Sequence, residues 1–286
     1  MKLRFNFALA TIILLSSCGS ESEDPQAEKT GNFLIEFENF IGTTPVTLVE
    51  EGSTDYMYTT SSGEPFNIDL FKYYISKVIL EGPNGEYFED EINVSPNTDE
   101  VKGFYLVDES NESSKYISLK NVPSGTYNKL RFTVGIDEEG IEEGAAGGVL
   151  DPASGAMFWN WNAGYIGLSI EGAAENSSQV LVEGPDFTIY DHSYEFHVGG
   201  WKDIQPAEGE LEKFVNNLKE IALEFDSNVK VADGLVPEAH IIMDALKVLD
   251  GVNIDFATTY IVHSPKSGES MANQLPNAFI LDHIHQ

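Results

Sequence analysis

The sequence predicts a mainly β protein, an antiparallel β-sandwich or barrel-like single domain with a few short helices. Apolar and polar residues alternate along short segments such as 33–37 and 127–134, and this period of two is the pattern of strands with one buried face. Turn sequences such as Gly-Pro-Asn-Gly at 82–85 separate the segments. Short strands with regular turns are typical of sandwiches and barrels. No internal repeat or change in composition marks a second domain.

The expected strands of the first half follow from this pattern. Phe33, Ile35 and Phe37 lie on one face of the first strand. The aromatic and β-branched segment 71–80 is a second strand, and residues 87–88 beyond the turn are expected to return beside it as a hairpin. Further strands are expected at 104–107, 116–119 and 127–134, with a tight turn at 122–127.

The second half contains one ambiguous stretch. Between residues 209 and 225 the apolar residues fit both a helical stripe and an alternation. We expect a short helix at 209–217 that runs into a strand at 218–225. The segment 270–283 near the end of the chain has a helical pattern apart from Pro276.

The first residues have the features of an export signal. Lys2 and Arg4 precede an apolar run that is too short to span a bilayer comfortably, and Cys18 ends a sequence that resembles a bacterial lipobox. We therefore expect a lipoprotein signal peptide at 1–17 and lipidation at Cys18. The alternative is an ordinary signal peptide with an incidental cysteine. Cys18 is the only cysteine, which excludes an internal disulfide and a thiolate metal site.

The order of segments predicts a location in the cell envelope. Residues 18–31 are mostly polar and acidic, so we expect a disordered tether there, followed by one folded β domain at 32–286. Acidic residues just after the cysteine resemble the surface-export signal of lipoproteins in Bacteroidetes-type bacteria. This suggests anchoring to the outer membrane, on its periplasmic or its surface-exposed face. The formal net charge of −31 argues against nucleic-acid binding and leaves the lipid anchor as the expected membrane contact.

Considered one by one, the residues that could bind a ligand or react are expected to have structural roles. Trp159 and Trp161 are two residues apart, which places both indoles on one face of an expected strand, and a tryptophan pair filling the core is the favoured interpretation. The acidic segment 137–144 lacks the spacing of a calcium-binding loop and is expected to be solvated. No nucleophile-elbow, zincin or Cys-x-x-Cys motif occurs, so we expect the protein not to be an enzyme.

Five motifs in the expected order resemble the MbnP family of copper-associated periplasmic or lipid-anchored proteins. The most distinctive is Trp-Asn-Trp-Asn-Ala-Gly-Tyr at 159–165, which is similar to the family's WxWxxGY signature. The others are Tyr-Tyr-Ile-Ser-Lys-Val-Ile-Leu at 73–80, Val-Pro-Ser-Gly-Thr-Tyr at 122–127 with Phe-Thr-Val-Gly-Ile-Asp at 132–137, Leu-Asp-Pro at 150–152 with Gly155 and Met157, and Phe-His-Val-Gly-Gly at 196–200. The resemblance extends over nearly the whole chain after the expected tether.

The resemblance implies a modification and a protein partner. Family members partner a di-haem cytochrome c peroxidase-like protein (MbnH type), which oxidises a tryptophan of the WxW region to kynurenine. Trp159 and Trp161 match that region, and Trp201 is a weaker third candidate. Indole has no lone pair to offer a metal, whereas ring opening yields an aromatic amine and a carbonyl. In the family the new amine helps to bind copper beside histidines.

The resemblance also ranks the histidines as copper ligands. His197 matches the family's histidine before Gly-Gly and ranks first, although a lone strand histidine without the family context is usually structural. His263 lies near the position of a C-terminal family histidine and ranks second. His240 and His192 are weaker candidates.

Two further features bear on copper. Asn39 stands where many family members carry a first-strand histidine, and an amide is a poorer copper ligand than imidazole, so copper binding is expected to be weak or absent if that histidine is a ligand. His283 and His285 lie at the chain end, where we expect fraying and only adventitious metal binding.

The resemblance therefore predicts a non-enzymatic, lipid-anchored protein that binds or handles copper and carries a kynurenine made from Trp159 or Trp161. The alternative is a surface-displayed β-sandwich that binds another ligand, such as a glycan, and holds no metal.

Overall fold

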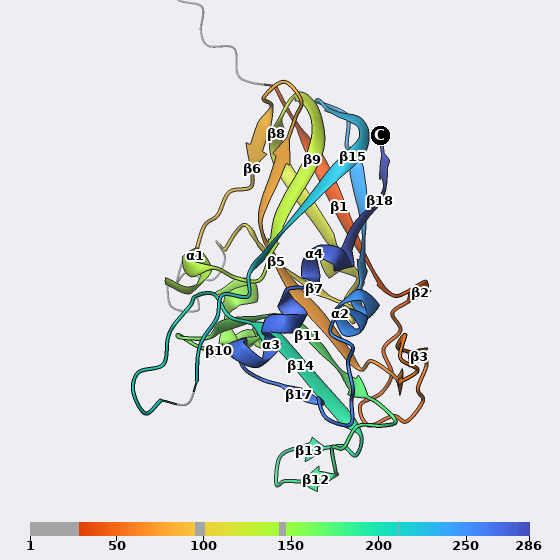
Figure 1. Cartoon of the computed structure of the whole chain (residues 1–286). Coiled ribbons are helices and arrows are strands. Elements are labelled where there is room, and N and C mark those ends of the chain that lie inside the picture. Colours follow the sequence, from red (N-terminus) through yellow and green to blue (C-terminus); the bar gives the residue numbers. More distant parts are fainter. Residues whose placement is uncertain (1–28, 95–100, 143–146, 211) are drawn as a thin grey trace, which may run out of the picture.

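The computed structural model describes residues 29–94, 101–142, 147–210 and 212–286 (Figure 1). The expected signal peptide at 1–17, the lipidation site Cys18 and most of the tether lie outside the described residues. The first strand, β1 (Thr30–Ile41), begins two residues before the expected start of the domain at residue 32. Among the described residues, no helix has the length and apolar character needed to cross a membrane.

In the part of the chain that the structure describes, nine strands form the larger of two main sheets: β5 (Leu70–Glu81), β6 (Tyr87–Glu89), β7 (Phe104–Asp108), β9 (Gly125–Val134), β10 (Phe158–Asn160), β11 (Gly164–Ala173), β14 (Ser193–Gly199), β15 (Lys219–Val231) and β17 (Ile261–Val262). The main path runs β15-β9-β5-β11-β14-β17. In addition, β6 and β7 pair with β5, and β10 pairs with the start of β11. The pairing of β14 with β17 is parallel, and the other pairings of this sheet are antiparallel.

Five strands form the smaller main sheet: β1, β2 (Thr44–Pro45), β8 (Tyr116–Pro123), β16 (Glu238–Asp244) and β18 (Phe279–His285). β1 runs parallel to β16 on one side and antiparallel to β8 and β2 on the other. β18 pairs antiparallel with the far side of β16. Two short hairpins complete the strands: β3 (Tyr58–Thr59) with β4 (Pro65–Phe66), and β12 (Val182–Glu183) with β13 (Thr188–Ile189).

The core lies between the two main sheets. Alternate residues of β1 are buried, and Phe33, Ile35 and Phe37 are fully enclosed as the sequence pattern predicts. The ring of Phe37 meets Tyr73 of β5 and Phe132 of β9 edge to face, with centroids 5.9 and 5.6 Å apart. Because these partners belong to the other sheet, the two sheets stack face to face, which is the sandwich arrangement.

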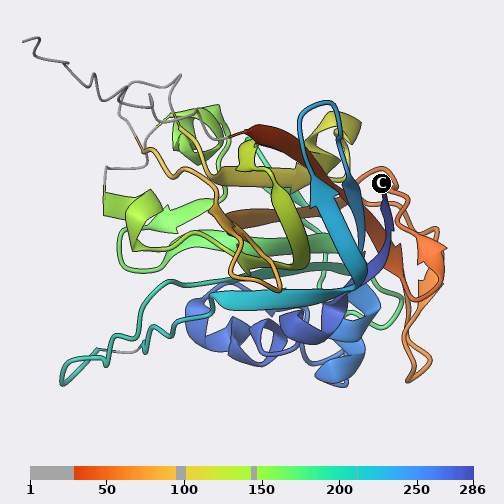
Figure 2. The same ribbon diagram turned by 90° about the horizontal axis from the view of Figure 1, so that it is seen from above.

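Within the described residues, short helices connect the strands: α1 (Glu138–Glu142), α2 (Ala245–Gly251), α3 (Pro265–Ala272), α4 (Leu275–Ala278), and the 3-10 turns Glu112–Lys115, Gly148–Leu150 and Pro152–Ser154. α2, α3 and α4 lie together along one side of the molecule (Figure 2). α3 begins with a capping box between Ser264 and Ser267 and packs closely on β14, where Gly268 lies against Val198. The predicted mainly β fold with a few short helices is confirmed, and the sheets are mixed rather than wholly antiparallel.

The helix expected at 209–217 is wrong. The described residues of this stretch are irregular, and Phe214 forms an isolated bridge with Ile204. The side-chain amide of Asn217 donates to the carbonyls of Gly199 and Pro265, each at 2.7 Å. The apolar residues of this stretch are therefore spaced by their contacts with distant parts of the chain and not by a helix. Strand β15 then continues past the expected end at residue 225 to Val231, with a register shift between Glu224 and Val229.

The helix expected to extend to residue 283 is also wrong in its second half. α4 ends at Ala278, and the chain continues as strand β18. Phe279, the first residue of β18, is buried in the core between the sheets, and the strand completes its backbone hydrogen bonds on the edge of β16. Burial of Phe279 and pairing with β16 outweigh the local helical pattern.

Candidate metal sites and the tryptophan segment

The tryptophan segment forms a tight connection between β10 and β11. β10 ends at Asn160, whose Oδ1 accepts the backbone N–H groups of Asn162 and Ala163, each at 2.9 Å. Gly164 follows with φ = +78°, and a Cβ there would lie 2.5 Å from Cδ1 of Trp201. Asn160 therefore closes the turn, and Gly164 is required by its left-handed backbone and by the close approach of an indole.

The two tryptophans do not share a strand face, so the spacing argument is wrong. Trp159 lies in β10 and is half-buried, whereas Trp161 lies in the turn and is 52% exposed. Trp161 stacks edge-on against Phe158 at 5.3 Å, and its carbonyl accepts the indole N–H of Trp201 at 3.3 Å. The interpretation of a tryptophan pair that fills the core is therefore also wrong, because one indole is half-buried and the other is open to solvent.

Two buried tyrosines lie behind this turn. Tyr165 donates its hydroxyl to the carbonyl of Leu150, and Tyr74 donates to the carbonyl of Val149, both at 2.7 Å. Burial raises the pKa of both phenols. Both tyrosines are therefore neutral hydrogen-bond donors at physiological pH and hold the loop that precedes β10 against the sheet.

The structure brings together the two histidines that rank first and second from sequence. His197 lies on β14, and His263 directly follows β17, the strand that runs parallel to β14. Their imidazole rings are stacked, with centroids 4.4 Å apart and an angle of 11° between the planes. The parallel pairing of β14 and β17 therefore brings the two imidazole rings into contact.

Carboxylates hold both rings. Nε2 of His197 lies 2.7 Å from Oε1 of Glu171, and Nε2 of His263 lies 2.7 Å from Oε2 of Glu195. The hydrogen bond to Glu195 raises the pKa of His263, and the same bond lowers the pKa of Glu195. Ligand atoms of Glu195, His197 and His263 lie within 4.8 Å of one another. These three residues, the Glu195 group, have the donor types that suit copper or zinc.

A carboxylate-lined cavity of about 240 Å³ adjoins the Glu195 group. Glu171 and Glu195 belong to its lining, together with Glu51 and Asp69. Burial, reinforced by the charges of Glu171 and Glu51, raises the pKa of Asp69 to about 6. This concentration of negative charge lowers the energy of a cation near the two imidazoles.

The tryptophan turn and the stacked histidines occupy different places along β11. Phe158 pairs with Tyr165 near the start of β11, whereas His197 pairs with Ser169 further along. Ser169 is the fourth residue after Tyr165 along the strand, which corresponds to about 13 Å at about 3.3 Å per residue. The tryptophan turn and the Glu195 group are therefore two separate features of the same sheet.

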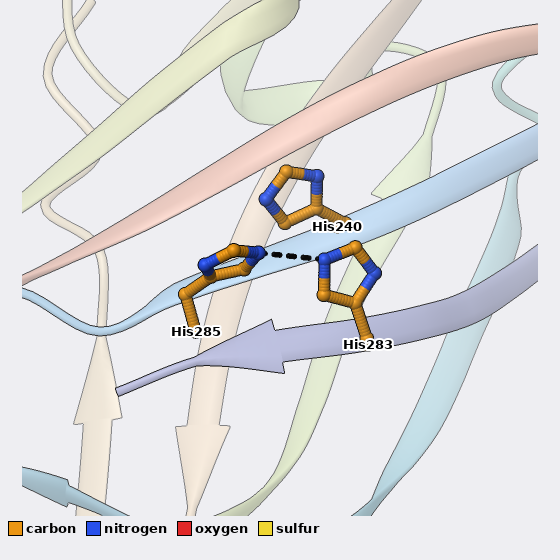
Figure 3. A group of neighbouring side chains, drawn as sticks. All are labelled: His240, His283 and His285. Carbon is orange, nitrogen blue, oxygen red and sulfur yellow. Dashed lines mark hydrogen bonds between the residues drawn. The ribbon is translucent and has the colours of Figure 1, made fainter.

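The lower-ranked histidines fall in two places. His192 lies in a turn with φ = +62°, and its Nδ1 is 3.0 Å from the carbonyl of Ser177. His240 lies on β16 beside His283 and His285 of β18 (Figure 3). The expected fraying of the last two histidines is wrong, because both belong to a paired strand. A sequence signal for this arrangement exists, because a spacing of two places both side chains on one face of a strand. The helical pattern of the preceding residues favoured a different prediction.

Asn39 has a structural role. It is buried on β1, its Nδ2 donates to Oε2 of Glu109 at 2.8 Å, and its Oδ1 accepts the hydroxyl of Tyr73 at 2.9 Å. Both ends of the amide are thus engaged within the protein. Asn39 therefore links the two sheets through hydrogen bonds at a closely packed position.

Comparison with a protein-family model agrees with the sequence motifs. A sequence model described as MbnP matches residues 30–266, from the first residue of β1 into α3. Among solved structures, MbnP from Methylosinus trichosporium is similar, with a TM-score of 0.43 and 18% sequence identity, and the alignment covers 77% of this chain and 78% of that chain. A comparison with curated proteins finds no match.

Proposed function

The protein belongs to the MbnP family, and from this premise we propose that it is a non-enzymatic, lipid-anchored envelope protein that binds copper. The observation that carries the proposal is the Glu195 group, in which two imidazoles and a carboxylate converge. The sequence supports the envelope location through the export signal and Cys18. The proposal assigns no chemical step to the chain itself.

The Glu195 group suits copper for two reasons. Imidazole nitrogen is a preferred ligand of copper, and a carboxylate adds charge that offsets that of the ion. Neighbouring strands hold His197 and His263, so both rings are already ordered before a metal arrives. Their ligand atoms lie within 4.8 Å of one another and that of Glu195, close enough for modest side-chain rotations to bring them onto one ion.

The modification belongs at Trp161 rather than Trp159. An oxidising protein partner needs access to the indole, and Trp161 is 52% exposed whereas Trp159 is half-buried. The oxidising equivalents come from the di-haem partner of the MbnH type. The C2–C3 bond of the indole is cleaved in a four-electron oxidation that the partner drives with two equivalents of a peroxide, and each equivalent supplies one oxygen atom. Hydrolysis then releases C2 as formate, which leaves kynurenine with a new carbonyl oxygen on the former C3 and a free aromatic amine.

The kynurenine amine and the imidazole pair act at separate places in this conformation. Phe158, beside the tryptophan turn, pairs with Tyr165, and His197 pairs with Ser169. These two positions of β11 are about 13 Å apart at about 3.3 Å per residue. We therefore propose that the imidazole pair holds copper independently of the modification. The modified turn, next to Trp201, is the surface that the partner reaches.

Copper binding is tested by competitive titration with a chromophoric chelator. His197→Ala and His263→Ala are each expected to weaken copper binding by at least tenfold, because each removes an imidazole ligand. His192→Ala is the matched control and should leave the affinity unchanged. Unchanged affinity in both of the first two variants would reject the Glu195 group as the copper site. A protein that binds no copper would favour the alternative ligand-binding module.

The modification is tested by intact mass and peptide mapping after co-expression with and without an MbnH-type partner. The partner is expected to produce a mass change that corresponds to the replacement of one carbon by one oxygen. Trp161→Phe should abolish the change, and Trp159→Phe should preserve it. An unchanged mass with the partner present would remove the modification from the proposal and leave the copper site untouched.

A further inference from the structure

Three histidines converge on the outer face of the smaller sheet, away from the Glu195 group. His240 lies on β16 directly opposite His283 on β18, and His285 lies opposite Glu238 (Figure 3). Ring centroids of His240 lie 4.3 Å from His283 and 4.9 Å from His285. One ring nitrogen of each histidine lies within 4.8 Å of those of the other two.

A one-residue bulge in β18 places the last two histidines on this face. The register between β16 and β18 shifts between His240 and Ile241, so that Asp282 is the extra residue on β18. The bulge changes which residues of β18 face outward. His283 and His285 then lie on the solvent side with His240, while Ile284 between them packs against the core.

Carboxylates orient two of the three rings. Nδ1 of His283 hydrogen-bonds to Oδ2 of Asp282 at 2.6 Å, and Nδ1 of His240 lies 3.0 Å from Oε2 of Glu36 on β1. Glu36 is held in turn by the hydroxyl of Tyr116, which donates to Oε1 at 2.6 Å. A carboxylate on one ring nitrogen fixes the tautomer and leaves the other nitrogen with a lone pair, as in many histidine metal sites.

The ring nitrogens that do not face a carboxylate lie close together, and the described protein groups do not give each of them a hydrogen-bond partner. Nε2 of His283 and Nε2 of His285 lie 2.7 Å apart, and Nε2 of His240 lies 4.0 Å from Oε2 of Glu238. Two neutral imidazoles share at most one proton between facing nitrogens. A divalent cation bound by one ring nitrogen of each histidine satisfies their lone pairs, and Glu238 offers a carboxylate oxygen for a fourth position.

We propose that His240, His283 and His285 form a second metal site that binds a borderline divalent transition-metal ion, Zn²⁺ or Cu²⁺. Three imidazoles with a fourth open or carboxylate position are typical of zinc and also suit Cu²⁺. His283 and His285 lie beyond the residues matched by the family model, which end at 266. The site therefore stands on this chain's own geometry and does not depend on the copper proposal.

Zn²⁺ titration of the purified metal-free protein against a competing chelator tests the site. The double variant H283N/H285N is expected to weaken Zn²⁺ binding at this site by at least a hundredfold and to remove its rise in Tm. His192→Asn is the matched control, and H197A/H263A keeps the site while it removes the Glu195 group. In the H197A/H263A background, Zn²⁺ affinity that stays within twofold when H283N/H285N is added would overturn the proposal.

Cu²⁺ provides a second readout that is independent of affinity. Electron paramagnetic resonance of the Cu²⁺-loaded H197A/H263A variant is expected to show nitrogen hyperfine coupling from three imidazoles, and His240→Asn is expected to reduce it to two. A spectrum with only oxygen ligands would overturn the proposal. A dimer that forms only with metal would also overturn it, because the ion would then bridge histidines of two copies.

Two controls guard the fold and the geometry. Circular dichroism and Tm of each metal-free variant should equal those of the unmodified metal-free protein, which shows that β18 remains paired. Glu36→Gln keeps all three imidazoles but removes the charge that orients His240, and Zn²⁺ binding should weaken by about 10-fold. Full affinity in Glu36→Gln would contradict a site that is built on oriented rings.

Discussion

His197 and His263 stack ring on ring, with centroids 4.4 Å apart, although one lies within β14 and the other follows β17 far along the chain. Each ring is held by its own carboxylate, and Glu195 is the carboxylate that lies within 4.8 Å of ligand atoms on both rings. The contact makes this edge of the larger sheet the place where single side-chain changes most directly test the proposed copper site.

Glu195→Gln is expected to weaken copper binding about 10- to 100-fold. The change preserves the size of the side chain but removes a negative charge and a good ligand oxygen beside His263. Competitive copper titration measures the effect. Glu183→Gln, at an exposed position on β12, is the matched control and should bind as tightly as the unmodified protein. Equal affinity in both variants would exclude Glu195 from the metal site.

Asp69→Asn is expected to stabilise the protein at neutral pH and not at low pH. Burial raises the pKa of Asp69 to about 6, so ionising it opposes folding. The folded state binds more protons than the unfolded state between pH values of about 4 and 6, and the contribution of this group to stability therefore falls as pH rises through that window. Asn carries no charge and removes the penalty.

Urea unfolding at several pH values measures this effect. At pH of about 7 the variant should gain about 1 to 2 kcal/mol in free energy of unfolding, allowing for solvent screening of a partly exposed group. At pH of about 4 the gain should vanish. Asp55→Asn, at an exposed site, is the control and should change stability little at either pH. A gain that is constant with pH would contradict a raised pKa at Asp69.

Gly164→Ala is expected to destabilise the protein by about 2 to 4 kcal/mol. The left-handed backbone disfavours any residue with a Cβ, and the added methyl would meet the Trp201 indole, so the backbone and packing costs add. Gly155→Ala separates the two costs, because Gly155 also has a positive φ but has nothing within 4 Å of its added Cβ. It should cost only about 1 to 2 kcal/mol. Thermal unfolding measures the loss of stability in both variants. Equal losses would show that the Trp201 indole moves aside at no energetic cost.

Asn39→Ala is expected to cost about 2 to 3 kcal/mol, because it leaves the buried hydroxyl of Tyr73 without its acceptor. Tyr73→Phe should cost less, about 1 kcal/mol, because the freed amide oxygen loses only one partner. A double-mutant cycle of these two changes should give a non-additive term of similar size. Additive losses would show that the bond contributes nothing. Copper affinity should be unchanged, because both ends of Asn39 are engaged within the protein.

The sequence predicts the strands better than the helices. In β1 buried and more exposed side chains alternate, so the period of two is visible in the sequence itself. β5 has four buried residues in a row, and its aromatic and β-branched composition predicts it instead. At 209–217 and after Ala278 the apolar residues instead contact neighbours that come from elsewhere in the chain, such as Ile204 for Phe214 and β16 for β18. Local periodicity carries no information about such partners. The helix at 209–217 and the second half of the helical segment 270–283 were therefore predicted wrongly.

By itself, the sequence determined the β-rich fold, the core alternation and the family, because burial on one face and short motifs leave local patterns in the order of residues. Only the tertiary structure decided which histidines meet. The parallel pairing of β14 with β17 brings His263 to His197, and the bulge in β18 turns His283 and His285 toward His240. These contacts depend on strand register between distant segments, and register is set by the packing of the whole core rather than by neighbours along the chain.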